Sequence, residues 1–133
     1  MIKLNYIKTY TKEIYVNGKE KLNIKFNDYI NQLLLGQLTT LKGRVDAIKS
    51  KYKLLKLTPI YINKYMCLFP IYNLKDYENI FINVFEIKTL DTINKKTRIE
   101  FINGDKLIVN KNINVINNYI RRAISINHNS WFF

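Results

Sequence analysis

A cluster of basic residues between positions 42 and 53 is the part of this sequence best suited to bind a polyanion. Lys42, Gly43 and Arg44 form a tripeptide with the character of a turn. Three lysines follow at alternate positions: Lys49, Lys51 and Lys53. This alternation places the three lysines on one face of a predicted strand, and a flat basic face suits a row of phosphates. A solvated outer strand face is the alternative that the pattern leaves open.

Arginine is rare in this chain, which makes each arginine informative. Lys, Asn, Ile and Tyr are heavily used, as expected of an AT-rich genome, so part of the lysine excess reflects codon drift. Only four arginines are present: Arg44, Arg98, Arg121 and Arg122. Where codon drift favours lysine, an arginine that is kept suggests that its position needs the planar guanidinium group with its five hydrogen-bond donors. Arg121 and Arg122 are therefore further candidate nucleic-acid contacts, and a position near a helix C-terminus, where the dipole favours cations, is their structural alternative.

The titratable residues lack the arrangements that catalysis requires. The single histidine, His128, has no nucleophile motif, phosphate loop or metal-ligand spacing around it. The acidic residues are scattered, and no pair has acid–base spacing. Cys67 is the only cysteine and is expected to be a small core residue. We predict no enzyme activity, no catalytic or metal-binding residue, no cofactor and no small-molecule substrate.

Composition favours one soluble domain with a polyanionic partner. The chain has 133 residues, enough for one core, and 47% of them are hydrophobic, which argues against disorder. The formal net charge of +12 favours a polyanion. No segment approaches the roughly 20 apolar residues of a membrane span, and no signal peptide opens the chain. We expect residues 1–133 to form a single DNA-binding domain that is cytoplasmic, nucleoid-associated and not bound to a membrane.

Turn chemistry and hydrophobic spacing predict the elements of the first third of the chain. Residues 1–11 are expected to form an edge strand or a loose arm. Residues 12–16 and 19–26 are expected to pair across Asn17-Gly18, the preferred pair of a type I′ turn. A short helix should follow, with Asn27 as its N-cap and Gly36 as its stop. Four apolar residues should face the core from it: Phe26, Ile30, Leu33 and Leu34.

Two further hairpins and a buried strand are expected in the middle of the chain. Residues 59–62 and 65–69 should pair around Asn63-Lys64. Residues 79–88 are apolar on both faces, which is typical of a central buried strand, and residues 91–96 should form a turn. The last hairpin should join residues 97–102 to residues 106–109 across Asn103-Gly104.

A second helix is expected near the end, with Asn112 as its cap. Its apolar residues recur at helical spacing: Ile113, Ile116, Ile120, Ala123 and Ile124. Three terminal aromatics, Trp131 to Phe133, are too apolar for a free tail and should dock on the core or on a second subunit. The predicted fold is α+β: one domain with a mostly antiparallel sheet of about seven strands, a short helix after the first hairpin and a C-terminal helix.

Several short motifs, in a fixed order, resemble the competence transcription factors of the ComK family. Gly43-Arg44, Pro59-Ile60 and residues 68–70 resemble the core of the family signature. Residues 99–107 and residues 119–124 resemble its Asn-Gly hairpin and the helix that follows. Two residues depart from the family pattern: Phe81 stands where the family usually has Trp, and Ile71 where it usually has Thr.

This resemblance implies a DNA-binding transcription regulator. The family activates genes for DNA uptake by binding A/T-rich promoter boxes as an oligomer, through the minor groove. The physics is compatible, because A-tracts have a narrow minor groove whose negative potential attracts Arg and Lys. Readout there is largely A·T against G·C, so few side chains suffice. The implied partners are double-stranded DNA and further copies of the chain, in a homodimer or higher oligomer.

Two alternatives remain open on the sequence. The chain could be a non-enzymatic protein-interaction module that keeps the fold and binds a protein partner through its apolar tail, residues 131–133, and through a predicted Tyr-rich loop over residues 71–79. It could also be a small RNA-binding domain, because tyrosines and lysines are interleaved. Binding to duplex DNA of defined composition separates the first interpretation from these two.

Overall fold

The computed structural model describes residues 3–35, 59–72 and 78–130, with side chains as far as residue 125. Within these ranges the chain forms nine strands, two α-helices and one short 3₁₀ helix. In chain order they are β1 (Tyr6–Thr9), β2 (Ile14–Val16), β3 (Glu20–Leu22), α1 (Phe26–Leu34), β4 (Ile60–Asn63), β5 (Met66–Pro70), β6 (Asn79–Asn83), η2 (Val84–Glu86), β7 (Ile87–Ile93), β8 (Lys96–Phe101), β9 (Lys106–Val109) and α3 (Ile113–Ser130).

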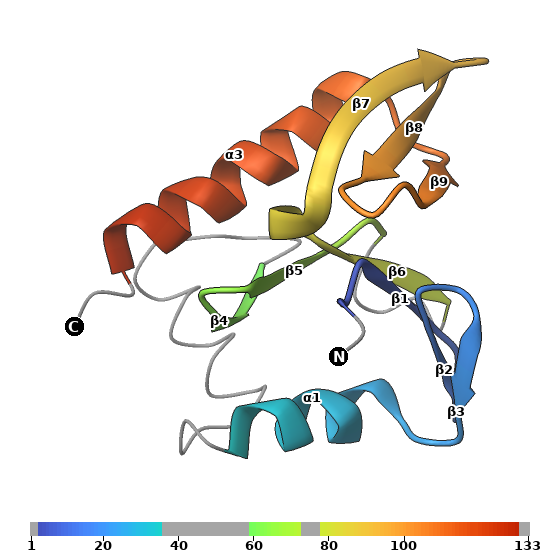
Figure 1. The fold of residues 1–133 in the computed structure, drawn as a ribbon, viewed down its shortest axis with the longest axis vertical. Coiled ribbons are helices and arrows are strands. Elements are labelled where there is room, and N and C mark those ends of the chain that lie inside the picture. The colour runs from blue at the N-terminus through green and yellow to red at the C-terminus, as the bar shows by residue number, and fades with distance from the viewer. Residues whose placement is uncertain (1–2, 36–58, 73–77, 131–133) are drawn as a thin grey trace.

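The described strands divide between two antiparallel sheets. Six strands form one sheet in the order β3-β2-β1-β6-β5-β4, and β7-β8-β9 form the other. Helix α1 lies on one side of the six-stranded sheet, and α3 lies with the three-stranded sheet on the other (Figure 1). The α+β class, the antiparallel pairing, the short helix after the first hairpin and the C-terminal helix are confirmed.

Strand β1 lies inside the six-stranded sheet, so the expectation of an edge strand or a loose arm is wrong. Ile7 pairs with Val16 of β2 on one side and with Phe81 of β6 on the other. Tyr6 and Ile7 are both buried, each in a different hydrophobic core. The position of a strand within a sheet depends on partners far along the chain, which the short mixed pattern of this segment does not reveal.

The predicted strand over residues 79–88 breaks after Asn83, where β6 ends and the chain crosses to the other sheet. The buried side chain of Asn83 explains the break. Its Oδ1 accepts hydrogen bonds from the backbone N–H groups of Cys67 and Phe85, at 3.1 and 3.3 Å. Its Nδ2 donates to the Leu4 carbonyl at 2.9 Å. Because the Asn83 side chain forms hydrogen bonds with these backbone groups, they do not need partners in a continuous β-ladder, and the strand can end here.

Both predicted Asn-Gly hairpins are confirmed, with different turn geometries. Asn17 and Gly18 have φ angles of 54° and 70°, as the central residues of a type I′ turn require. Val16 pairs with Glu20, so the loop between β2 and β3 has three residues instead of the expected two. In the other hairpin only Gly104 has a positive φ, 95°, and its N–H donates to the Phe101 carbonyl at 2.9 Å. This is the arrangement of a three-residue loop with a glycine bulge.

Two other turns differ slightly from their predicted positions. β4 and β5 turn at Lys64 and Tyr65, one residue later than expected. The expected turn over residues 91–96 is shorter, because β7 and β8 continue into it. The chain turns only at Asn94 and Lys95, whose φ angles are 48° and 65°. Two residues with positive φ are sufficient for a tight hairpin.

Helix α1 begins at Phe26, so the predicted cap at Asn27 is wrong. Lys25 is the N-cap, and its carbonyl accepts the Tyr29 N–H at 3.0 Å, although no side chain caps the helix. Asn27 lies in the first turn instead. The preceding strand β3 ends at Leu22, earlier than residue 26, because the chain must leave the sheet before this helix can begin.

The predicted core side of α1 is confirmed. Ile30 and Leu34 are fully buried, and the Phe26 ring stacks on Phe81 with centroids 4.0 Å apart. The predicted stop at Gly36 lies outside the described residues.

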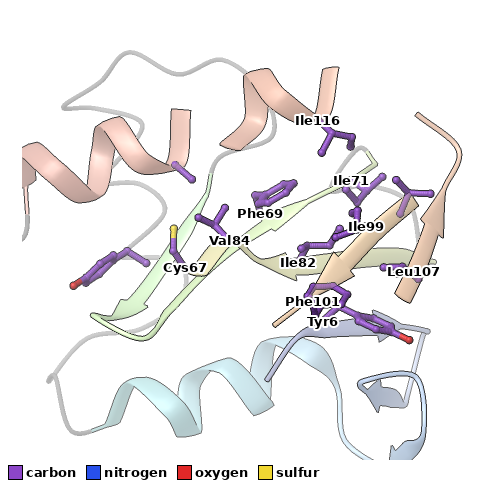
Figure 2. Packing of buried hydrophobic residues seen from close by; sticks show 13 residues of the cluster. Tyr6, Cys67, Phe69, Ile71, Ile82, Val84, Ile99, Phe101, Leu107 and Ile116 are labelled. Atoms are coloured by element: carbon purple, nitrogen blue, oxygen red, sulfur yellow. The ribbon is translucent and has the colours of Figure 1, made fainter. Parts of the chain in front are cut away.

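The six-stranded sheet separates two hydrophobic cores. Neighbouring residues of a strand point to opposite faces, so Phe81 lies in the core beneath α1 and Ile82 in the core beneath α3. Figure 2 shows the second core, in which the large sheet, the small sheet and α3 meet through Phe69, Ile82, Ile99, Phe101 and Ile116. Both faces of the large sheet are therefore covered over its central strands. Within the described ranges, the surface left for a partner is on the helices, the turns, the exposed edge strand β3 and the outer face of the small sheet.

Candidate nucleic-acid interface

Most of the predicted contact residues fall outside the described residues. Six of them belong to the segment 36–58: Lys42, Gly43, Arg44, Lys49, Lys51 and Lys53. Their expected strand and common basic face stay predictions. The other two, Arg121 and Arg122, lie on α3 and are described.

Helix α3 is fixed by a cap at its start and by apolar residues along one side. Asn112 Oδ1 accepts the backbone N–H of Asn114 at 2.7 Å, which confirms the predicted cap. Ile116 and Ala123 are fully buried in the core shown in Figure 2. Ile124, which was expected on the same side, is 49% exposed. The side of α3 that faces the core is thus centred on Ile116 and Ala123, and the polar residues on the opposite side face outward.

The two arginines of α3 have different surroundings. Arg121 is exposed, whereas Arg122 is half-buried. Burial raises the pKa of the Tyr119 phenol, and the nearby positive charge of Arg122 acts in the opposite direction. Tyr119 packs edge-on against Phe69, with ring centroids 6.0 Å apart. Arg121 therefore presents its side chain to solvent, and Arg122 lies closer to the core.

The helix dipole does not explain these arginines. α3 continues to Ser130, so Arg121 and Arg122 are not at its C-terminal end as the sequence had suggested. The stabilisation of a cation by the dipole falls off within the last turn. No Gly or Pro, the two strongest helix-ending residues, occurs between residues 121 and 130.

Arg98 has an intramolecular role. Its Nε and Nη2 donate to the two carboxylate oxygens of Asp91, at 3.0 and 2.6 Å, across the β7–β8 pair. Hydrogen bonding to Arg98 lowers the pKa of Asp91, and the same bond raises the pKa of Arg98. Lys106 stands opposite Glu100 on the same face. Because opposite charges alternate on this outer face of the small sheet, its attraction for a polyanion is weak.

A pocket of about 270 Å³ lies where the two Asn-Gly turns meet. Its lining consists of Val16, Asn17, Lys19, Glu20, Asn103 and Asp105. Lys19 Nζ lies 3.8 Å from a carboxylate oxygen of Asp105, so its charge is already balanced, and Glu20 adds a second carboxylate. Two carboxylates beside one lysine make this pocket a poor phosphate site.

The sequence interpretation missed the amide-rich outer side of α3. Asn114 and Asn118 are exposed there, together with Arg121. Two signals were available: the spacing of four and then three residues, and the absence of any acidic residue after Asp105. Neither signal shows which side of the helix is buried, and this depends on tertiary packing.

The family model described as ComK protein matches residues 2–130 of the chain. The chain belongs to the ComK family. This confirms the family that the short motifs resembled, and the matched range of this ComK-family chain includes both sheets and both described helices. Neither the curated proteins nor the solved structures compared with the chain gave a match.

Membership in the ComK family supports a role like that of the competence transcription factors, in the regulation of transcription. In the described part of the chain, no helix combines the length and the apolar character needed to span a membrane.

Proposed function

We propose that this ComK-family chain is a transcription regulator, without enzyme activity or cofactor, that binds A/T-rich promoter DNA through the minor groove at the nucleoid. The uneven distribution of charge carries this proposal. Residues 36–58 hold six Lys or Arg and one Asp, and no acidic residue follows Asp105. Cations gathered in segments that are nearly free of carboxylates attract a polyanion more strongly than evenly mixed charges do. Family membership supports the regulatory role.

The proposed contacts divide into groove readers and phosphate binders. Arg44, which follows Gly43 in the sequence, enters the narrow minor groove, where the negative potential of A-tracts is strongest. Discrimination of A·T from G·C in that groove needs few donors. The remaining proposed residues contact phosphates: Lys42, Lys49, Lys51, Lys53, Arg121 and Arg122.

The deciding experiment measures affinity for matched A/T-rich and G/C-rich duplexes at two salt concentrations. We expect a preference for A/T, a steep fall of affinity with salt, and displacement by a minor-groove drug. Replacement of A·T by inosine·cytosine keeps the minor-groove pattern and changes the major groove, so binding should tolerate it, and should also tolerate added major-groove methyl groups. Equal affinity for both duplexes would contradict minor-groove reading.

Variants test the residue roles within the same assay. Arg44→Ala should cost about 1–3 kcal/mol of specific binding. Replacement of Lys49, Lys51 or Lys53 by Ala should weaken binding to all duplexes alike and lower the salt slope by about one. Arg98→Ala is the matched control, because the Arg98 guanidinium is already hydrogen-bonded to Asp91 within the protein.

The same assay separates the alternative functions. A protein that does not bind duplex DNA but binds single-stranded RNA supports the RNA-binding alternative. A chain that binds neither is a protein-interaction module.

We propose a homodimer or higher oligomer as the binding species. Sedimentation at protein concentrations on the order of tens of micromolar tests this, because weak self-association lies in that range. A monomer at those concentrations, with and without DNA, would contradict it.

A further inference from the structure

Four polar residues form an exposed row along the outer side of α3: Asn114, Asn118, Arg121 and Ser125. They are separated by four, three and four residues, so they share one side of the helix. Ile116 and Ala123, on the opposite side, are buried in the core of Figure 2. In Figure 1, α3 lies at the periphery of the molecule, with β5 and β7 on its inner side. We call the four exposed residues the outer row.

The chemistry of the outer row suits an anion. Asn, Ser and Arg side chains all donate hydrogen bonds, and α3 contains no Asp or Glu. None of the ion pairs among the described residues includes Arg121, whereas Arg98 on the small sheet is held by Asp91. In the described part of the chain, the outer row therefore offers hydrogen-bond donors and holds no carboxylate of its own that would compete for them.

The length of the row fits a duplex. Asn114 and Ser125 are separated by about 16 Å along the helix axis, given the rise of about 1.5 Å per residue. Over that distance a DNA duplex presents about ten phosphate charges, counting both strands. Side chains of these types commonly donate to phosphate oxygens, and such contacts fix the position of a protein on a duplex without reading its sequence.

We infer that the outer row of α3 binds the phosphate backbone of duplex DNA and contributes contacts that do not depend on sequence. The inference rests on the proposed function and adds to it a surface of neutral amides centred on Arg121. It assigns no contact to base edges, so it is compatible with reading through the minor groove.

Two substitutions test the row directly. Asn118→Asp replaces a donor by a negative charge in almost the same shape, and Arg121→Ala removes the guanidinium. Each should weaken binding on the order of tenfold, because hydrogen bonds to charged groups are strong. The loss should be equal for A/T-rich and G/C-rich duplexes, and Arg121→Ala should lower the salt slope by about one. Arg121→Lys should retain most of the affinity, since it keeps the charge.

Asn27→Asp is the matched control, because Asn27 is also exposed, lies on α1 at the other side of the molecule and undergoes the same change of charge (Figure 1). It should alter affinity much less than Asn118→Asp does, since screening confines charge effects to roughly 10 Å and Asn27 is not part of the outer row. Urea unfolding of each variant checks that the fold is retained.

The results of these experiments distinguish a failure of the inference about the outer row from a failure of the proposed DNA-binding function. If the wild type prefers A/T-rich DNA but Asn118→Asp and Arg121→Ala bind normally, the row is not an interface and the proposed function stands. An equal loss in Asn27→Asp would show that net charge alone matters, and would overturn the inference. A change in the A/T preference itself would mean base contact, which also contradicts it. If the wild type binds no duplex, the proposed function and the inference both fail.

Discussion

Asn5 Nδ2 donates a hydrogen bond to Asn103 Oδ1 at 3.1 Å and joins the two sheets of the protein. The same nitrogen donates to Asp105 Oδ2 at 3.2 Å. The backbone N–H of Asn5 donates to Asn17 Oδ1 at 2.7 Å, so both Asn-Gly turns are tied to one residue. Asn5 is 1% exposed, and its side chain ties the small sheet to the large one beside their shared hydrophobic core.

Asn5→Ala should lower the free energy of unfolding by about 1–3 kcal/mol, because it removes two hydrogen bonds between the sheets, each worth about 0.5–1.5 kcal/mol. Urea denaturation followed by circular dichroism measures this. Asn23→Ala is the control, since Asn23 is exposed between β3 and α1 and its loss should change stability by less than about 0.5 kcal/mol. Equal effects of the two substitutions would show that the contact does not hold the sheets together.

Gly18 and Gly104 should respond differently to the same substitution. Both have positive φ, 70° and 95°, so alanine at either site costs about 1–2 kcal/mol of backbone strain. A Cβ at Gly18 would also collide with the Tyr6 hydroxyl, whereas a Cβ at Gly104 meets no atom within 4 Å. Gly18→Ala should therefore be the more destabilising of the two in chemical denaturation. The reverse order would contradict the close approach of Tyr6 to the first turn.

Phe81→Trp introduces the residue usual in the family and should nevertheless destabilise this chain. Phe81 is 4% exposed and stacks on Phe26 at 4.0 Å, so a larger ring overpacks the core beneath α1 at a cost of about 1–3 kcal/mol. In a Phe26→Ala background the same change should cost less, because the space is released. A double-mutant cycle by urea denaturation measures this coupling, and additive effects would argue against the stacking.

Cys67 should be unreactive in the folded protein. It is 1% exposed, which confirms the predicted core role, and burial raises the pKa of its thiol to about 12 from its ordinary value of 9.0. As the pH rises, the Cys67 thiol therefore loses its proton at a lower pH in the unfolded chain than in the folded protein. The contribution of the thiol to stability is therefore fully present below about pH 9 and is lost as the pH rises toward 12.

Two measurements check this prediction. A thiol reagent at pH 8 should react with Cys67 only after urea is added. Between pH 9 and pH 11, the wild type should lose more of its free energy of unfolding than Cys67→Ala, which cannot ionise at this position. Rapid labelling of the native protein, or identical pH profiles, would contradict the burial of the thiol.

The sequence alone determined the elements that depend on neighbouring residues. Asn17-Gly18 forms its turn because both residues adopt positive φ locally, and Asn112 caps α3 through a contact two residues away. The core side of α1 follows from the helical repeat, which brings Ile30 and Leu34 together. Net charge and the scarcity of arginine, which suggested the polyanionic partner, are also properties of composition.

Contacts between distant residues decided the rest. The break after Asn83 depends on a hydrogen bond to Leu4, 79 residues earlier, and the pairing of Arg98 with Asp91 depends on the register of β7 against β8. Arg121 and Arg122 are adjacent in the sequence and equal in charge. Only the packing of α3 on the second core, which buries one side of the helix, leaves Arg121 facing solvent and turns Arg122 toward Tyr119.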